Sequence, residues 1–91
     1  MTGRRAPEEL LEFPCTFEFK AFGDAADEGF AETVRLAVSR VVPVGADALR
    51  IRLSSGGQYQ CVTVLVRLET GAQLAGIYAI LRGIEGLRYL L

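Results

Sequence analysis

Two hydrophobic periodicities follow one another along this chain, and their order constrains the fold more than any other feature. In four stretches the apolar side chains recur at every second residue, which is the pattern of half-buried strands. In two others they recur at every third or fourth residue, which is the pattern of amphipathic helices. The strand-like stretches are residues 15–22, 49–53, 59–69 and 87–91, and the helical stretches are 27–42 and 70–83. The sequence therefore predicts the order β-α-β-β-α-β.

This order is typical of the ferredoxin-like α+β sandwich, a four-stranded antiparallel sheet with strand order 4-1-3-2 and two helices on one face. Each helical stretch has a single apolar stripe, so both helices can cover the same face and the other face stays open. A chain of 91 residues has no room for a second core. We therefore expect residues 1–7 to be a flexible N-terminus and residues 8–91 to form one domain. Residues 8–13 could form a short turn that Pro14 stops.

Single residues refine the helix boundaries. Thr70 is a good N-cap for the second helix, and Asp24 or Asp27 can cap the first. Gly76 lies inside the second helix, where glycine costs up to about 1 kcal/mol relative to alanine. We expect it to permit the close approach of another backbone, such as that of the sheet.

Alternation also assigns strand residues to a face of the sheet. Leu49, Ile51 and Leu53 are predicted to face the helices. The same holds for the residues in phase on the longest strand, which are Val62, Val64, Val66 and Leu68. The opposite phase predicts the open face, with Thr16, Glu18, Lys20, Phe22, Arg50, Arg52, Cys61, Thr63, Leu65, Arg67, Arg88 and Leu90.

The second half of the chain is basic, and its arginines gather on this open face. Residues 50–91 contain five arginines and two glutamates, so they carry a charge of +3, whereas the whole chain carries −1. We take the candidate binding surface to be Arg50, Arg52, Cys61, Thr63, Leu65 and Arg67. An acidic protein or a phosphorylated ligand could bind such a surface. Arginines on an edge strand also discourage sheet-to-sheet aggregation, which is the alternative interpretation.

A second candidate is the turn before the longest strand. Its residues, Ser54, Ser55, Gly56 and Gly57, could form a backbone nest for an anion. No lysine follows and a strand comes next, so the pattern is not that of a phosphate-binding P-loop. A plain hairpin turn with glycines at positive φ is the simpler interpretation.

Composition excludes most catalytic chemistry. The chain has no histidine, which removes histidine triads and histidine metal ligands. Cys15 and Cys61 form no metal-binding pair, and alternation puts them on opposite faces of adjacent strands, so we expect them to be unpaired. We expect no enzymatic activity, no metal and no cofactor.

The longest uncharged stretch, residues 53–66, falls short of the ~20 apolar residues of a membrane span. With no signal-peptide pattern either, we expect a cytoplasmic protein with reduced thiols and no membrane partner.

Other activities known on this element order find little support. RNA-recognition motifs stack bases on aromatic residues of strands one and three. Here Phe17 and Phe19 are in phase with the core, and the predicted open face of strand three, with Cys61, Thr63 and Leu65, has no aromatic residue. RNA binding therefore ranks last, and we do not expect nucleic acid to be a partner. Acylphosphatase chemistry needs an asparagine, which the chain lacks.

Three stretches together resemble the YbeD family of small bacterial cytoplasmic proteins. They are residues 9–14, followed by the Phe-rich strand; residues 54–59, followed by residues 62–64; and residues 77–78 through 87–91. The resemblance implies a ferredoxin-like fold similar to the regulatory ACT domains, and a suggested link to lipoate metabolism. The family has no agreed catalytic residues, so none is assigned here. ACT-like domains hold small ligands near the corner that Gly23 and Asp24 form in this chain, although the acids at this corner disfavour an anion.

These observations predict a regulatory or adaptor domain that binds a protein partner through the open sheet face or an edge strand. The alternative is an ACT-like sensor that binds a small metabolite at a dimer interface. We also expect a homodimer, because the last strand, residues 87–91, is mostly apolar and lies at a predicted sheet edge.

Overall fold

The alternating stretches form the four strands of one antiparallel sheet in the computed structural model, which describes residues 11–91. The strands are β1 (Cys15–Asp24), β2 (Leu49–Leu53), β3 (Tyr59–Leu68) and β4 (Tyr89–Leu90). Their order is β2-β3-β1-β4, which is the predicted order seen from the other edge. The ferredoxin-like fold is confirmed. The predicted flexible residues 1–7 lie outside the described residues, as does most of the turn predicted at residues 8–13.

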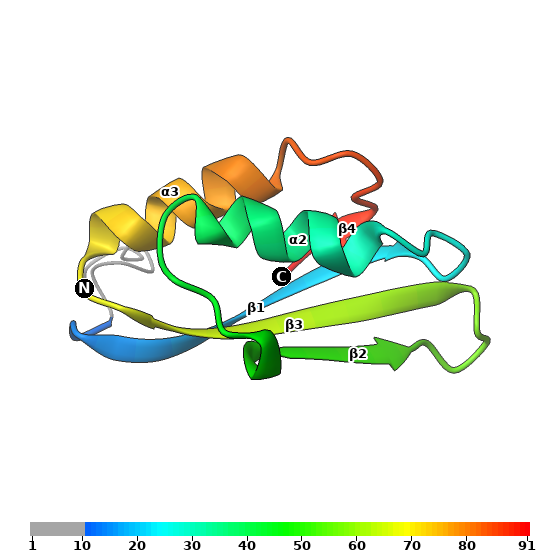
Figure 1. Cartoon of the computed structure of the whole chain (residues 1–91), viewed down its shortest axis with the longest axis horizontal. Coiled ribbons are helices and arrows are strands. Elements are labelled where there is room, and N and C mark those ends of the chain that lie inside the picture. The colour runs from blue at the N-terminus through cyan, green and yellow to red at the C-terminus, as the bar shows by residue number, and fades with distance from the viewer. Residues whose placement is uncertain (1–10) are drawn as a thin grey trace, which may run out of the picture.

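The two helices are α2 (Phe30–Ser39) and α3 (Gly71–Leu81), and a short 3₁₀ helix, η1 (Ala46–Ala48), precedes β2. Both helices lie on the same side of the sheet (Figure 1). Their apolar stripes and the inner face of β1 and β3 enclose the core, which the following buried side chains form: Phe19, Ala21, Phe30, Val34, Ala37, Val38, Val42, Val62, Val64, Val66, Leu68, Leu74, Ile77 and Leu81. The predicted inward set of β3 is therefore confirmed in full.

The predicted facing of β2 is confirmed, but two of its three helix-facing residues are not buried. Leu49 packs against the core, but Ile51 is 55% exposed and Leu53 is 60% exposed. Their phase is the predicted one, because Ile51 pairs with the buried Val62. The helices cover β1 and β3, and β2 runs along the lower edge of the sheet in Figure 1, so its far end projects beyond their cover.

The last strand is shorter than predicted and has the opposite phase. Tyr89 pairs with Phe22, which belongs to the open face, and Leu90 pairs with the buried Ala21. Leu90 thus packs against the core instead of lying on the open face. A strand of two residues offers too little alternation for its phase to be inferred from sequence.

The predicted N-cap is confirmed for α3 but not for α2. The Thr70 side chain accepts a hydrogen bond from the Gln73 N–H at 3.2 Å, as expected of an N-cap. Helix α2 begins at Phe30 and not at Asp27, whose carboxylate instead accepts from the Gly29 N–H at 3.2 Å. Gly76 permits no close backbone approach, because a Cβ placed there would lie 3.9 Å from the side chain of Val41, an ordinary contact distance.

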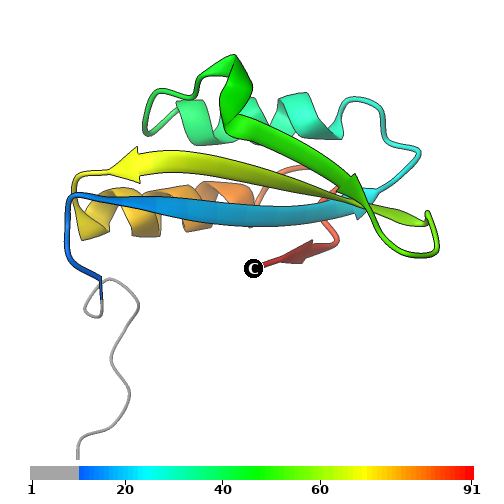
Figure 2. The ribbon, with the colours of Figure 1, turned by 90° about the horizontal axis from the view of Figure 1, so that it is seen from below.

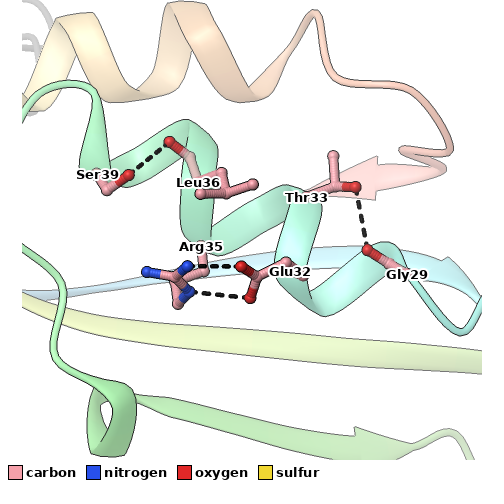
Figure 3. A network of polar contacts seen from close by, with 6 residues as sticks. All are labelled: Gly29, Glu32, Thr33, Arg35, Leu36 and Ser39. Carbon is pink, nitrogen blue, oxygen red and sulfur yellow. Dashed lines mark hydrogen bonds and ion pairs between the residues drawn. The ribbon is translucent and has the colours of Figure 1, made fainter.

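Several polar side chains of α2 form hydrogen bonds or ion pairs with nearby residues of the same segment (Figure 3). Arg35 forms an ion pair with Glu32 one turn earlier, and the Thr33 hydroxyl donates to the Gly29 carbonyl at 3.0 Å. The Ser39 hydroxyl donates to the Leu36 carbonyl at 2.8 Å. These contacts join residues of α2 and the preceding Gly29, so they stabilise the helix itself.

Both cysteines are free thiols, as predicted. Cys15 pairs with Leu68 and Cys61 pairs with Phe22, so the two lie at different positions and on opposite faces of the sheet.

Candidate binding surface

The open face of the sheet is a lattice of cross-strand rows. One row consists of Lys20, Thr63 and Arg50, and the next of Phe22, Cys61 and Arg52, on β1, β3 and β2 respectively. Paired residues of antiparallel strands have Cα atoms about 4.5–5.5 Å apart, so the side chains of a row stand next to one another. Figure 2 shows these strands in front of the helices.

The two rows enclose a shallow hollow of about 130 Å³, lined by Glu18, Lys20, Arg50, Arg52, Cys61 and Thr63. We call it the cationic hollow. Three of its six residues are cations, and Glu18 is its one acid. Within residues 11–91, no carboxylate lies within 4.0 Å of Lys20, Arg50 or Arg52. Such cations keep most of their capacity to bind an anionic group.

The structure brings together four of the six residues of the predicted surface, namely Arg50, Arg52, Cys61 and Thr63. Leu65 is exposed beside them and borders a smaller hollow of about 60 Å³. Arg67 lies farther along the sheet, opposite Thr16, and forms an ion pair with Glu69 at 3.1 Å. Lys20 takes the place of Arg67 as the third cation. The sequence predicted the face of the sheet on which Lys20 lies, but its place in the same cross-strand row as Arg50 depends on the register.

The predicted anion turn uses several of its polar groups within the hairpin. The Ser54 N–H donates to the Tyr59 carbonyl at 2.8 Å, and the Gly57 N–H donates to the Ser54 carbonyl at 2.8 Å. The Tyr59 N–H donates to the Ser54 hydroxyl at 3.1 Å. Gly57 has a φ of +71°, and Gly56 does not have a positive φ. An anion would have to use the remaining N–H groups of Ser55 and Gly56, so this site stays a prediction and the hairpin interpretation is the stronger one.

Aromatic side chains meet at the far end of the open face, which sequence reasoning missed. Phe22, Tyr59, Tyr89 and Arg88 line a hollow of about 360 Å³, and we call this group the aromatic corner. The rings of Phe22 and Tyr89 lie 5.8 Å apart between centroids. The prediction that β3 has no aromatic residue on its open face is thus wrong at Tyr59, the first residue of the strand, which pairs with Asp24.

Arg88 ties the aromatic corner to β1. Its guanidinium donates to both carboxylate oxygens of Asp24, at 3.1 and 2.9 Å. These hydrogen bonds, together with the positive charge of Arg88, hold the pKa of Asp24 below its usual value, although desolvation acts in the opposite direction. The Arg88 N–H also donates to the Phe22 carbonyl at 2.7 Å.

The corner between β1 and α2 is filled by the protein itself. A Cβ on Gly23 would lie 2.8 Å from the ring of Phe30. The buried Gln60 amide donates to the carbonyls of Asp24 and Asp27, at 2.8 Å each. A small ligand at this corner, as in ACT-like domains, stays a prediction.

Among residues 11–91, no three His, Cys, Asp or Glu side chains lie together so that they could hold a metal ion. No helix in this range is long and apolar enough to cross a membrane.

Comparison with known proteins shows the family. Residues 8–91 match the family described as a protein of unknown function (DUF493). A UPF0250 protein of Paraburkholderia phytofirmans is 45% identical over 78 residues, which cover 84% of this chain and 85% of the relative. A UPF0250 protein of Shewanella loihica is 41% identical over 83 residues, which cover 91% and 92%. The chain belongs to this family, which is the YbeD family, so the resemblance seen in the sequence is confirmed.

The chain is also similar to a solved structure. The solution structure of protein HP0495 from H. pylori superimposes with a TM-score of 0.65 over 99% of this chain and 98% of that chain. The sequence identity is 12%, so the likeness supports the fold alone.

Proposed function

We propose that this member of the YbeD family is a non-enzymatic regulatory or adaptor domain that binds an acidic partner protein through its open sheet face. The observation that carries the proposal is the cationic hollow, in which Lys20, Arg50 and Arg52 have no carboxylate within 4.0 Å among residues 11–91. Cations that have no partner in the protein itself are available to steer and bind an acidic surface.

A protein partner suits this surface better than an enclosed metabolite does. Pockets that enclose small ligands usually measure about 300–1,000 Å³, and the cationic hollow measures about 130 Å³. Its side chains are spread over three neighbouring strands. A shallow charged surface of this extent matches the polar part of a transient protein interface.

The test is a quantitative capture experiment from a bacterial lysate with four baits, the wild type and three variants. Arg50→Glu and Arg52→Glu each reverse one charge of the cationic hollow. Arg40→Glu makes the same change in net charge at the exposed end of α2. We expect the two hollow variants to lose the partners that the wild type retains, and Arg40→Glu to keep them. Raising the salt concentration should weaken capture by the wild type. Equal loss in all three variants would contradict the proposal.

A small-molecule sensor is the second candidate, and the aromatic corner is the observation that favours it. Its hollow of about 360 Å³ falls within the usual range for small ligands. Three aromatic rings beside a guanidinium suit a planar ligand. A thermal-shift screen of metabolites, repeated with Tyr89→Ala, would identify such a ligand by a stabilisation that the variant lacks.

A further inference from the structure

β2 is an edge strand, and no other strand among residues 11–91 lies along its outer side. At the end of the hairpin the Ser54 N–H donates to the Tyr59 carbonyl, which places these two residues at a hydrogen-bonded position of the ladder. Hydrogen-bonded pairs alternate along an antiparallel ladder, so Arg52 with Cys61 and Arg50 with Thr63 are the next such pairs. The N–H and C=O groups of Leu49, Ile51 and Leu53 therefore point away from β3, toward the edge of the sheet.

The side chains of β2 give this edge two different faces. Arg50 and Arg52 are exposed on the open face. Ile51 and Leu53 are large, exposed and apolar on the helix side. A strand placed beside β2 would meet cations on one of its faces and aliphatic side chains on the other.

We infer that β2 binds an extended segment of the partner as a fifth strand, and that apolar residues alternate with Asp or Glu in that segment. The inference rests on the proposed function and specifies the partner's chemistry. The main-chain groups of Leu49, Ile51 and Leu53 pair with the added strand. Its acids stand opposite Arg50 and Arg52, and its apolar side chains cover Ile51 and Leu53.

The charges argue against a second copy of this chain as the added strand. In an antiparallel pairing of two β2 strands centred on Ile51, Arg50 of one copy stands opposite Arg52 of the other. If the two strands are shifted by one hydrogen-bonded pair in either direction, Arg50 stands opposite Arg50 of the other copy, or Arg52 opposite Arg52. Every in-phase antiparallel register that pairs three or more residues of β2 thus contains an Arg–Arg pair, which is destabilising. An acidic segment removes this repulsion.

The test uses the full chain labelled with ¹⁵N and a blocked synthetic peptide in which valine and glutamate alternate. We expect the peptide to shift the amide signals of Leu49, Ile51 and Leu53 and to slow their hydrogen exchange. A peptide with lysine in place of glutamate should bind at least about threefold more weakly, and the double variant Arg50→Glu/Arg52→Glu should reverse this preference.

Two controls isolate the backbone pairing from simple charge attraction. The first is the acidic peptide with N-methyl groups on alternate residues. Methyl groups on one alternating set of residues remove the N–H groups that face β2 and should abolish binding. Methyl groups on the other set remove N–H groups that point away from β2 and should leave binding intact. The second is Ile51→Pro, which removes an N–H that points away from β3 and is therefore tolerated at an edge. This variant should melt close to the wild type but lose the peptide.

The outcomes separate this inference from the proposed function. If the acidic peptide binds, and both N-methylated forms bind equally well, the open face attracts acids but β2 adds no strand, so the inference is wrong and the proposed function stands. If the peptide fails to bind and the hollow variants also capture the same proteins as the wild type, both are wrong.

Discussion

Val64→Asp should unfold the domain, whereas the same substitution at its neighbour Thr63 should be tolerated. Val64 is fully buried at the centre of β3 and pairs with the buried Phe19. Thr63 faces the open side, between Lys20 and Arg50. The pair thus compares the same new side chain on the two faces of one strand.

The cost at Val64 has three parts. Losing a buried valine side chain costs about 1.5–3 kcal/mol. Keeping an aspartic acid with an ordinary pKa of ~3.9 protonated at pH 7 costs about 4 kcal/mol, because each pKa unit is worth about 1.4 kcal/mol. Burying the neutral carboxyl without a hydrogen-bond partner adds about 1–3 kcal/mol. The total, about 7–10 kcal/mol, is comparable with the about 5–14 kcal/mol expected for 91 residues.

Thr63→Asp has two small and opposite effects. Aspartate is disfavoured in strands by up to about 1 kcal/mol. Each new cross-strand pair, with Lys20 and with Arg50, contributes about 0.2–1 kcal/mol in its favour. The melting temperature should therefore fall by no more than about 8 °C, since 1 kcal/mol corresponds to about 4–8 °C in a domain of this size.

Circular dichroism during thermal and urea denaturation provides the measurement, at pH 7 and again near pH 4. The buried carboxyl in Val64→Asp has a raised pKa, so its penalty grows as the pH rises above the unfolded value of ~3.9 and is smallest below it. We expect any residual structure of this variant to be more stable, relative to the wild type, at pH 4 than at pH 7. If the two variants melted alike, the assignment of the faces of β3 would be wrong.

Four further predictions follow from single contacts. Gly23→Ala should destabilise the domain by about 1–3 kcal/mol in urea denaturation, because its Cβ would lie 2.8 Å from the Phe30 ring. Gly76→Ala should stabilise it by about 0.5–1 kcal/mol in the same assay, since an alanine fits there and favours the helix; a loss of stability would show a contact that the structure lacks. The pKa of Asp24 is lowered by Arg88, so the ion pair is intact above the ordinary value of 3.8 and is lost as the pH falls through the lowered pKa. The protection factors of the β4 amides, which are corrected for the intrinsic pH dependence of exchange, should fall over that interval and, in Arg88→Gln, should already be low at neutral pH. The chain should dimerise at high micromolar concentration through the β4 edge, and a light-scattering mass that stays near 9.9 kDa would contradict this.

The sequence predicted the parts of the fold that depend on periodicity alone. Four alternating stretches and two apolar stripes were enough for the sheet, its strand order and the buried face of β3. The errors concern how far the helices reach. Alternation gives the side of the sheet on which Ile51 lies, but not whether a helix covers that side at the edge. It also fails at β4, where two residues define no phase.

The sequence predicted only part of the candidate surface, because alternation gives the face on which a residue lies but not its neighbours on other strands. The residue types and their phase placed Arg50, Arg52, Cys61 and Thr63 on one face. The register between strands decided which cations are neighbours, and register depends on turn geometry and core packing across the whole sheet. It placed Lys20 and Arg50 in one cross-strand row, on either side of Thr63, whereas Arg67 lies farther along the sheet and pairs with Glu69. It also brought Tyr59 and Tyr89 to Phe22, from three separate strands.

The composition of β2 bears on whether its edge is merely protected or is built to bind. Protection against aggregation needs charge at the edge, and Arg50 and Arg52 supply it on the open face. It does not need Ile51 and Leu53, which remain more than half exposed on the helix side. Full burial of an aliphatic side chain of this size is worth about 1.5–3 kcal/mol, and the isolated domain obtains only part of it. A solvent-exposed edge would be at least as well served by polar residues at these two positions. An added strand would cover both side chains, pair the outward main-chain groups and neutralise the arginines, so one event would satisfy all three features of this edge.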